Sequence, residues 1–113
     1  MNTPETIAAL TRTAKKYHRA GVEALGRNRP EDAVRALRLS VELDPELDVA
    51  WNDLGVMMEA LGNPHEAMRC YRRALGVRAG FLEARSNLGM LMLQMELAQV
   101  LRRRVFTSSA AHG

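Results

Sequence analysis

The stretch from Trp51 to Gly80, WNDLGVMMEALGNPHEAMRCYRRALGVRAG, has the pattern of two helices separated by one break. Gly62-Asn63-Pro64 forms this break, because glycine commonly ends a helix and proline is best tolerated in the first turn of the next. Gly55 lies inside the first helical segment, where glycine costs about 1 kcal/mol relative to alanine. A close crossing of the two helices would compensate for that cost. The stretch therefore predicts a hairpin of two helices.

The same pattern recurs along the chain at a fixed offset of 34 residues. Gly21, Gly55 and Gly89 are separated by this interval. The offset also relates Pro30 to Pro64, Ala33 to Ala67, Arg35 to Arg69, Arg38 to Arg72, Val22 to Val56, Leu54 to Leu88 and Met58 to Met92. A period of this length is typical of a solenoid, in which each unit buries its apolar face against its neighbours. The chain is therefore predicted to be all-α and built from stacked helix hairpins.

The repeated residues resemble those of the tetratricopeptide repeat (TPR), a helix-turn-helix unit of the same length. In the segment 48–81 the motif positions hold Trp51, Leu54, Gly55, Ala67, Tyr71 and Ala74, while Ala79 replaces the usual closing proline. In the segment 14–47 the equivalent positions hold Tyr17, Ala20, Gly21, Ala33, Leu37, Ser40 and Pro45. The resemblance implies an all-α, right-handed superhelical solenoid of antiparallel helix hairpins.

A third copy begins at residue 82 but departs from the motif. Leu88 and Gly89 are kept, whereas Arg85 replaces the aromatic residue and Glu-Leu-Ala at 96–98 stands where the turn should be. We therefore expect one domain with an incomplete last unit. Its parts are a helical extension at 1–13, repeats at 14–47 and 48–81, an incomplete third repeat or capping helix at 82–106, and a frayed tail at 107–113.

Local signals place the helix boundaries. Thr3-Pro4 is a plausible start, with threonine as the N-cap and proline at the first helical position. Asp44-Pro45 ends a helix, because proline restricts the residue before it. We expect helices at 4–26, 30–43, 48–61, 64–77 and 81–104.

The composition fits an ordinary globular domain: of 113 residues, 47% are hydrophobic and 26% are charged. The longest strongly apolar run, 88–93, is far shorter than the roughly 20 residues that a membrane helix needs. Residues 1–16 lack the apolar segment of a secretory signal, and the single Cys70 cannot form an internal disulfide. We therefore expect no membrane span and a cytoplasmic protein.

Residues with catalytic or metal-binding potential are scattered. His18, His65 and His112 are far apart, and no His-x-x-x-His or Cys-x-x-Cys spacing exists. Cys70 has no histidine at a helical step that would activate it, and none of the 13 carboxylates forms a convincing acid–base pair. We expect no metal site, no cofactor and no enzymatic activity.

The net charge of +3 comes almost wholly from arginines spread over several helices. A nucleic-acid interface would favour a continuous basic stripe with interleaved aromatic residues. The run Arg102-Arg103-Arg104 with neighbouring arginines keeps nucleic-acid binding open as an alternative of a different class, but solvated helix faces are the simpler interpretation.

The first helix of each predicted unit carries a stripe that would face a groove. This stripe consists of Lys15, His18, Arg19 and Val22 in the first unit, Val49, Asn52, Asp53 and Val56 in the second, and Glu83, Ser86, Asn87 and Met90 in the third. The resemblance implies that this stripe lines a concave groove, where the chain binds a protein or peptide partner.

Asn52 and Asn87 are the best candidates for contacts with a peptide backbone, because a side-chain amide both donates and accepts hydrogen bonds. Some TPR proteins hold a peptide's C-terminal carboxylate with lysine, arginine and asparagine at groove positions. This chain instead carries Asp53 and Glu83 on that path, and two carboxylates would repel such a ligand. The corresponding positions otherwise hold His18, Val22 and Asn87.

The order of charges along the groove predicts a ligand polarity. Lys15 and Arg19 would attract an acidic residue near the first unit, while an apolar residue would lie over Val22 and Val56. Exposed charge pairs contribute at most about 1 kcal/mol each, so the apolar contact should dominate the affinity.

The last helix is predicted to associate with something, because no second helix follows to cover its apolar face. The residues predicted to form this oligomer interface are Leu91, Met92, Met95, Leu97 and Leu101. Leaving such side chains in water forgoes roughly 1.5 to 3 kcal/mol each. Self-assembly is therefore the main alternative to peptide binding, although the chain could also fold back on itself or receive a helix from a longer protein.

Overall fold

The computed structural model describes residues 3–112, with side chains described for residues 3–107. This part of the chain contains helices and no strand, in agreement with the predicted all-α class. The helices are α1 (Pro4–Gly26), α2 (Pro30–Leu43), α3 (Asp48–Ala60), α4 (Pro64–Val77) and α5 (Leu82–His112). Each helix packs against the next one in the chain.

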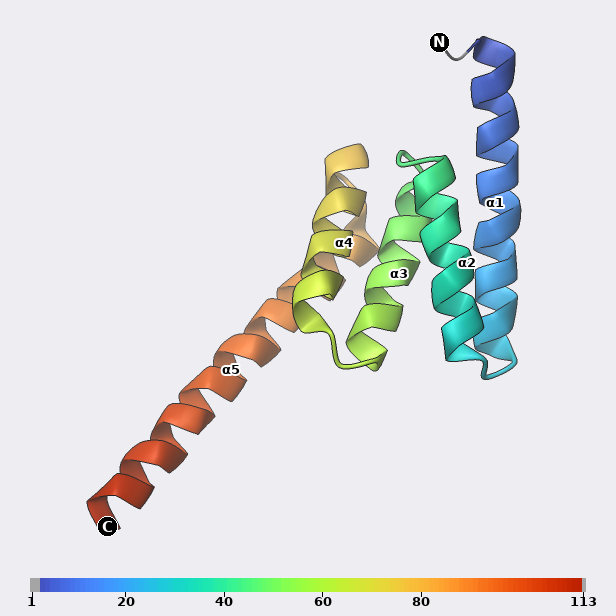
Figure 1. Ribbon diagram of the computed structural model, residues 1–113. Helices are drawn as coiled ribbons and strands as arrows, with labels where there is room; N and C mark the ends of the chain where they lie inside the picture. The colour runs from blue at the N-terminus through green and yellow to red at the C-terminus, as the bar shows by residue number, and fades with distance from the viewer. Residues whose placement is uncertain (1–2, 113) are drawn as a thin grey trace.

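The helices form two hairpins followed by one long helix (Figure 1). The hairpins α1–α2 and α3–α4 stand side by side, and the first turns of α5 pack against α4 and contact α3. The remainder of α5 leaves the body and projects away from it, while the first turns of α1 extend past α2 at the other end (Figure 1). The molecule is accordingly elongated, with principal dimensions of 67 × 31 × 25 Å.

The two hairpin turns share one backbone geometry. Asn28 and Gly62, at equivalent repeat positions, have positive φ angles of 58° and 79°. Glycine and asparagine tolerate this left-handed conformation better than other residues. In each turn a backbone N–H donates to the carbonyl five residues earlier at 2.8 Å, from Arg29 to Ala24 and from Asn63 to Met58. The proline that follows then begins the second helix of the hairpin.

A close helix crossing explains the glycines inside α1 and α3. A Cβ atom at Gly21 would lie 2.8 Å from Cγ of Leu37, and one at Gly55 would lie 2.6 Å from Cε1 of Tyr71. Both distances are shorter than real Cβ contacts allow. Each hairpin therefore seats a large side chain of its second helix against a glycine of its first, as the sequence predicted in outline.

The core runs through the hairpins and reaches the start of α5. Its largest fully buried side chains include Tyr71, Leu37 and Leu54. Trp51 is partly buried between this core and a smaller cluster around Phe81, and its Nε1 donates to the carbonyl of Pro45 at 2.7 Å. Trp51 thus holds the loop before α3 as well as filling space between units.

The third unit has no turn. Glu96 and Ala98 occupy the positions of Gly62 and Pro64, and neither residue favours a helix end there, so α5 continues to His112. The predicted frayed tail is therefore wrong for residues 107–112, which form the last turns of α5; Gly113 lies outside the described residues. A Cβ at Gly89 would meet nothing within 4 Å, unlike its counterparts in α1 and α3.

Candidate functional site

The predicted stripe lies on α1, α3 and α5, the first helices of the three units. The structure leaves exposed Lys15, Arg19, Val22, Val56, Glu83, Ser86 and Met90. Three of these, Val22, Val56 and Met90, occupy equivalent repeat positions on successive first helices. We call these three residues the apolar row; Lys15 and Arg19 are also exposed on α1, and Glu83 is exposed on α5.

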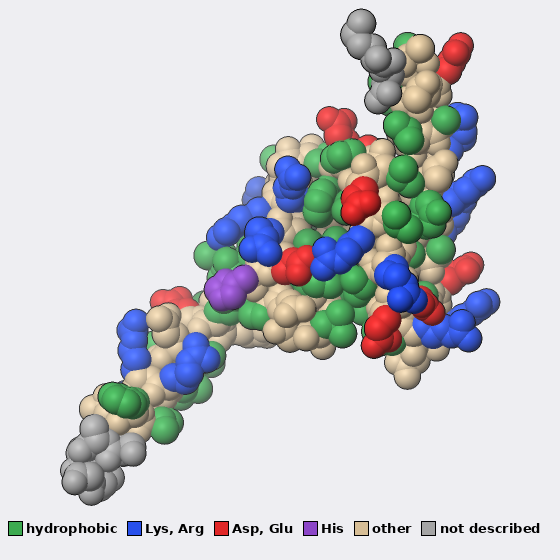
Figure 2. All heavy atoms as spheres, viewed as in Figure 1, with side chains coloured by type: hydrophobic (Ala, Val, Ile, Leu, Met, Phe, Trp, Pro, Cys, Tyr) green, Lys and Arg blue, Asp and Glu red, His purple; other side chains and the backbone are tan. Residues whose placement is uncertain are grey.

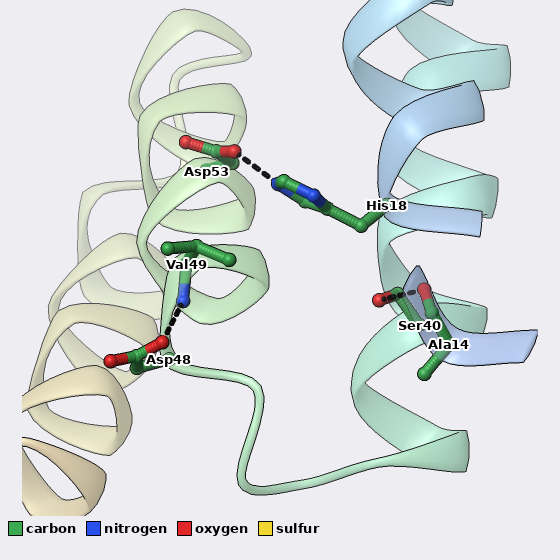
Figure 3. A network of polar contacts seen from close by, with 6 residues as sticks. All are labelled: Ala14, His18, Ser40, Asp48, Val49 and Asp53. Carbon is green, nitrogen blue, oxygen red and sulfur yellow. Dashed lines mark hydrogen bonds and ion pairs between the residues drawn. The ribbon is translucent and has the colours of Figure 1, made fainter. Parts of the chain in front are cut away.

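His18 and Asp53 do not face a ligand freely, because they contact each other. Nε2 of His18 on α1 lies 2.6 Å from Oδ2 of Asp53 on α3, and both side chains are partly buried (Figure 3). The contact becomes an ion pair when His18 is protonated. It ties the first hairpin to the second and reduces the negative field that Asp53 offers to a ligand.

Asn52 and Asn87 form a second contact of the same kind between α3 and α5. Nδ2 of Asn87 donates to Oδ1 of Asn52 at 3.1 Å. Asn52 is only 1% exposed, so the prediction that it contacts a peptide backbone is wrong. Asn87 is half-buried and keeps its own amide oxygen as a further acceptor.

These two contacts share one sequence separation. Each joins residues 35 positions apart, so a residue in one unit meets the position after its equivalent in the next unit. The 34-residue period alone does not reveal this shift of one residue. The shift depends on how adjacent first helices lie against each other. Val49 also departs from the prediction: it packs partly buried against the cluster of Ala74, Phe81 and Ala84.

Within the first hairpin, the buried hydroxyl of Ser40 on α2 donates to the carbonyl of Ala14 on α1 at 2.8 Å (Figure 3). Asp48 accepts from the backbone N–H of Val49 at 2.8 Å, at the first turn of α3. A carboxylate there is favoured by the positive end of the helix dipole. The Ser40 contact therefore joins α2 to α1, and the Asp48 contact stabilises the start of α3.

Cys70 and Tyr71 are buried in α4 and have altered acidity. Burial, followed by the nearby Glu66 carboxylate, raises the pKa of Cys70 from its ordinary 9.0 to about 11. Burial and the hydrogen bond that its hydroxyl donates to Glu59 at 2.8 Å also raise the pKa of Tyr71. The Cys70 thiol is therefore protonated at neutral pH and is a poor nucleophile.

Several arginines are held by neighbouring groups. Arg38 pairs with Glu66 at 2.6 Å, Arg78 pairs with Asp48 at 2.6 Å, and Arg73 stacks 5.1 Å from the centre of the Trp51 ring. Arg35 pairs with Asp32 one turn away on α2. On the face shown in Figure 2, basic side chains are interspersed with acidic and hydrophobic ones. This distribution favours structural and solvated roles for these arginines.

The part of the chain that the structure describes contains neither a helix suited to crossing a membrane nor a cluster of metal-binding side chains. No helix there has the length and apolar character needed to cross a membrane. Among the same residues, no three histidine, cysteine, aspartate or glutamate side chains are grouped so that they could hold a metal ion.

The predicted oligomer interface divides between buried and exposed residues. Leu91 is 4% exposed and belongs to the chain's own core, and Met95 packs against that core. Both residues are therefore unavailable for the predicted interface, because α5 turns this face towards α3 and α4. Met92, Leu97 and Leu101 remain exposed. A hollow of about 820 Å³ lies between α4 and α5, and Met92 is part of its wall.

No protein-family model matches the chain. Three longer proteins align with parts of it. An N-terminal acetyltransferase A complex auxiliary subunit of Arabidopsis thaliana is 34% identical over 60% of the chain. Superkiller protein 3 of Schizosaccharomyces pombe is 29% identical over 85%, and a peroxisomal targeting signal receptor of Kluyveromyces lactis is 30% identical over 50%. All three contain tetratricopeptide repeats.

Solved structures agree on the fold. Two crystal structures of MamA, a TPR protein, superpose with a TM-score of 0.72 at 21% and 20% identity, and cover 81% and 88% of this chain. The chain has the TPR fold. It spans 8%, 7% and 10% of the three aligned relatives and 58% of each MamA chain. The match therefore concerns the repeats, and in general terms TPR relatives identify a protein-interaction module.

Proposed function

We propose that the chain binds a partner peptide or helix along the stripe on α1, α3 and α5. One observation carries the proposal: Val22, Val56 and Met90 are exposed apolar residues at the same position on the first helices of three successive units. Exposed apolar side chains scattered singly need no explanation, but one position that is apolar and exposed in every unit favours a shared binding surface. A partner that crosses the three helices would cover all three side chains.

The charges beside this row define the partner's chemistry. Lys15 and Arg19 favour an acidic residue at the α1 side, and Glu83 favours a basic or amide residue at the α5 side. Asp53 contributes less than its charge suggests, because it already contacts His18 at 2.6 Å. Asn87 offers one amide oxygen to a peptide N–H between the charged ends.

The aligned relatives support an interaction role. One is named as an auxiliary subunit of a complex, and another is named as a receptor for a targeting signal. Both names describe proteins that act by contacting other molecules. We propose the same general role, that of a non-enzymatic scaffold, for this chain.

A peptide titration tests the groove. Peptides selected from a random library on the immobilised chain would be labelled and titrated with wild type and with variants. Val56→Asp should weaken binding about tenfold or more, because it places a charge in the apolar row. Arg19→Ala should weaken it less, by about fivefold at most. Val77→Asp is the matched control, since Val77 is 41% exposed, like Val56 at 39%, but lies on α4.

The expected ranking is Val56→Asp first, Arg19→Ala second and Val77→Asp indistinguishable from wild type. A stronger effect of Val77→Asp would place the binding surface on the second helices. A stronger effect of Arg19→Ala than of Val56→Asp would show that charge, rather than the apolar row, dominates the affinity.

Self-association through α5 is a second candidate function. Its distinguishing observation is the exposure of large apolar side chains on α5, among them Leu93 at 63% and Leu97 at 59%. Burying such a side chain is worth roughly 1.5 to 3 kcal/mol. Light scattering on the chain across the micromolar range should show a mass that rises with concentration. A constant mass of 12.6 kDa would contradict self-association.

Two further proposals concern location and nucleic acid. The buried, protonated Cys70 thiol is compatible with the proposed cytoplasmic location, which cell fractionation tests. Nucleic-acid binding through Arg102, Arg103 and Arg104 is less favoured than binding of a peptide or helix. A mobility shift that disappears steeply with added salt would support that alternative instead.

A further inference from the structure

The exposed apolar side chains of α5 follow a coiled-coil spacing. Met90, Leu93, Leu97 and Val100 are separated by three, four and three residues, and all four are exposed. A 3-4-3 spacing of apolar residues is the pattern by which two helices pack side chains along a common seam. We call these four residues the α5 seam. Leu101 adjoins the seam and is also exposed.

The seam points away from the chain's own body. Successive residues of a helix are rotated by about 100°, so Leu97 lies about 160° around the helix from Met95. Met95 packs against the core, as does Leu91 one turn earlier. The hollow beside α4 is lined by Met92 and Gln99 and by none of the seam residues. The chain's own α3 and α4 therefore cannot cover the seam.

The charges beside the seam distinguish between orientations of a second α5. Arg102, Arg103 and Arg104 follow the seam directly, so a parallel, in-register pair would place these arginines against each other. Glu96 and Arg103 lie seven residues apart and thus on the same flank of the helix. In an antiparallel pair, the Glu96 of each copy can face the Arg103 of the other, which forms two opposite-charge pairs.

We propose that α5 pairs antiparallel with the α5 of a second copy of this chain along the seam. Leu97 of each copy packs against Val100 of the other, and the stem of Arg104 lies over Leu93. Because Met90 faces position 107 in this register, the contact extends about 25 Å along the helix. The register that packs Leu97 against Val100 also brings Glu96 opposite Arg103. A second copy of this chain therefore matches the seam in both shape and charge. The inference rests on the self-association proposed above and adds its surface, its orientation and its register.

The projecting part of α5 supports this choice. It carries hydrophobic side chains beside basic ones and has no other helix next to it in the chain (Figures 1 and 2). Most of the stability of a helix in a protein comes from packing one of its faces against another element. Pairing would cover the apolar side and leave arginine head groups in solvent.

Two glutamate variants test the surface. Light scattering of the full chain should show a dimer that Leu97→Glu dissociates, with the dissociation constant raised about tenfold or more, because two charges enter the seam. Met92→Glu is the matched control: it places the same charge on an exposed apolar position of α5 outside the seam. It should change the dissociation constant by less than about threefold.

A cysteine pair tests the orientation. In the antiparallel register, position 90 of one copy faces position 107 of the other, whereas within one helix the two are about 25 Å apart. Met90→Cys combined with Thr107→Cys should therefore give a covalent dimer on mild oxidation, and Met90→Cys alone should not. The buried Cys70 is present in both variants and serves as an internal control.

The outcomes separate the seam from self-association in general. A wild-type chain that stays monomeric at high micromolar concentration would overturn both. A dimer dissociated by Met92→Glu and unaffected by Leu97→Glu would overturn the seam but leave self-association standing. A covalent dimer from Met90→Cys alone would overturn the antiparallel orientation. The seam shares Met90 with the row on α1, α3 and α5, whereas Leu97→Glu and Met92→Glu both leave that residue in place.

Discussion

The second and third units begin alike and end differently. Both first helices carry a Leu-Gly pair, and both contribute to the same core. In the second unit, α3 ends at Ala60 and α4 returns, so that Tyr71 fills the space against Gly55. In the third unit α5 runs on to His112, and Gly89 meets nothing within 4 Å.

A few turn residues therefore decide whether the first helix of a repeat ends and a second helix returns against it. Gly62 adopts a left-handed φ of 79°, and Pro64 starts the returning helix. Glu96 and Ala98 at the same positions are good helix formers. The apolar pattern of the first helix is retained in both units, so the pattern alone cannot close the hairpin.

The largest expected contrast in stability is between Tyr71 on α4 and Val105 on α5, which occupy equivalent repeat positions. Tyr71→Ala should lower the free energy of unfolding by about 3 to 5 kcal/mol, because Tyr71 is fully buried. Val105→Ala, 34 residues later on the exposed part of α5, should change it by less than about 0.5 kcal/mol. Urea unfolding at low protein concentration measures both. Equal effects would mean that Val105 packs against the body.

Replacing Gly55 and Gly89 by alanine should have smaller effects on stability, and the two effects should differ in sign. Gly55→Ala should destabilise the fold by about 1 to 3 kcal/mol, because the added Cβ would lie 2.6 Å from the Tyr71 ring. Gly89→Ala should stabilise it by about 0.5 to 1 kcal/mol, since alanine favours a helix and meets no neighbour. Thermal unfolding of the two variants decides this. A destabilising Gly89→Ala would reveal a helix seated on Gly89.

The change of the free energy of unfolding at alkaline pH should come from the second unit, where Cys70 and Tyr71 are buried in α4. The pKa of Cys70 is raised from 9.0 to about 11 in the fold, so its thiol contributes stability that is complete below pH 9.0 and is lost as the pH rises to about 11. Tyr71, whose pKa is raised too, adds to the loss at higher pH. At pH 10 the loss should be about 1 kcal/mol.

Cys70→Ala provides the control for this titration. The variant should be less stable at neutral pH but should lose less further stability between pH 9 and pH 10 than wild type. An unchanged slope would mean that the thiol titrates equally in the folded and unfolded chains.

Much of the fold could be predicted because its signals are local. Turn residues and prolines gave helices at 4–26, 30–43 and 64–77 that match α1, α2 and α4, and α3 ends one residue earlier than expected. The end of α5 was missed, because small polar residues after Thr107 suggested fraying while no breaker actually stops the helix. Helix α5 runs without a break through 96–98, where the motif would place a turn.

The candidate site was less predictable, because exposure depends on the neighbouring helix. Asn52 has the position of a groove residue, yet the one-residue shift between adjacent first helices pairs it with Asn87 and buries it. Leu91 was assigned to the free face of α5, although it faces the core. In both cases helical periodicity gives the angle between residues, whereas only packing determines which side becomes buried.

The distance between residues 89 and 105 tests directly whether the third unit is one open helix. Spin labels at Gly89→Cys and Val105→Cys, in a Cys70→Ala chain diluted with unlabelled protein, would report that distance by pulsed electron resonance. A straight α5 separates the two backbones by about 24 Å. A distance near 10 Å, as between packed helices of a closed hairpin, would show that the third repeat folds back and would contradict the account.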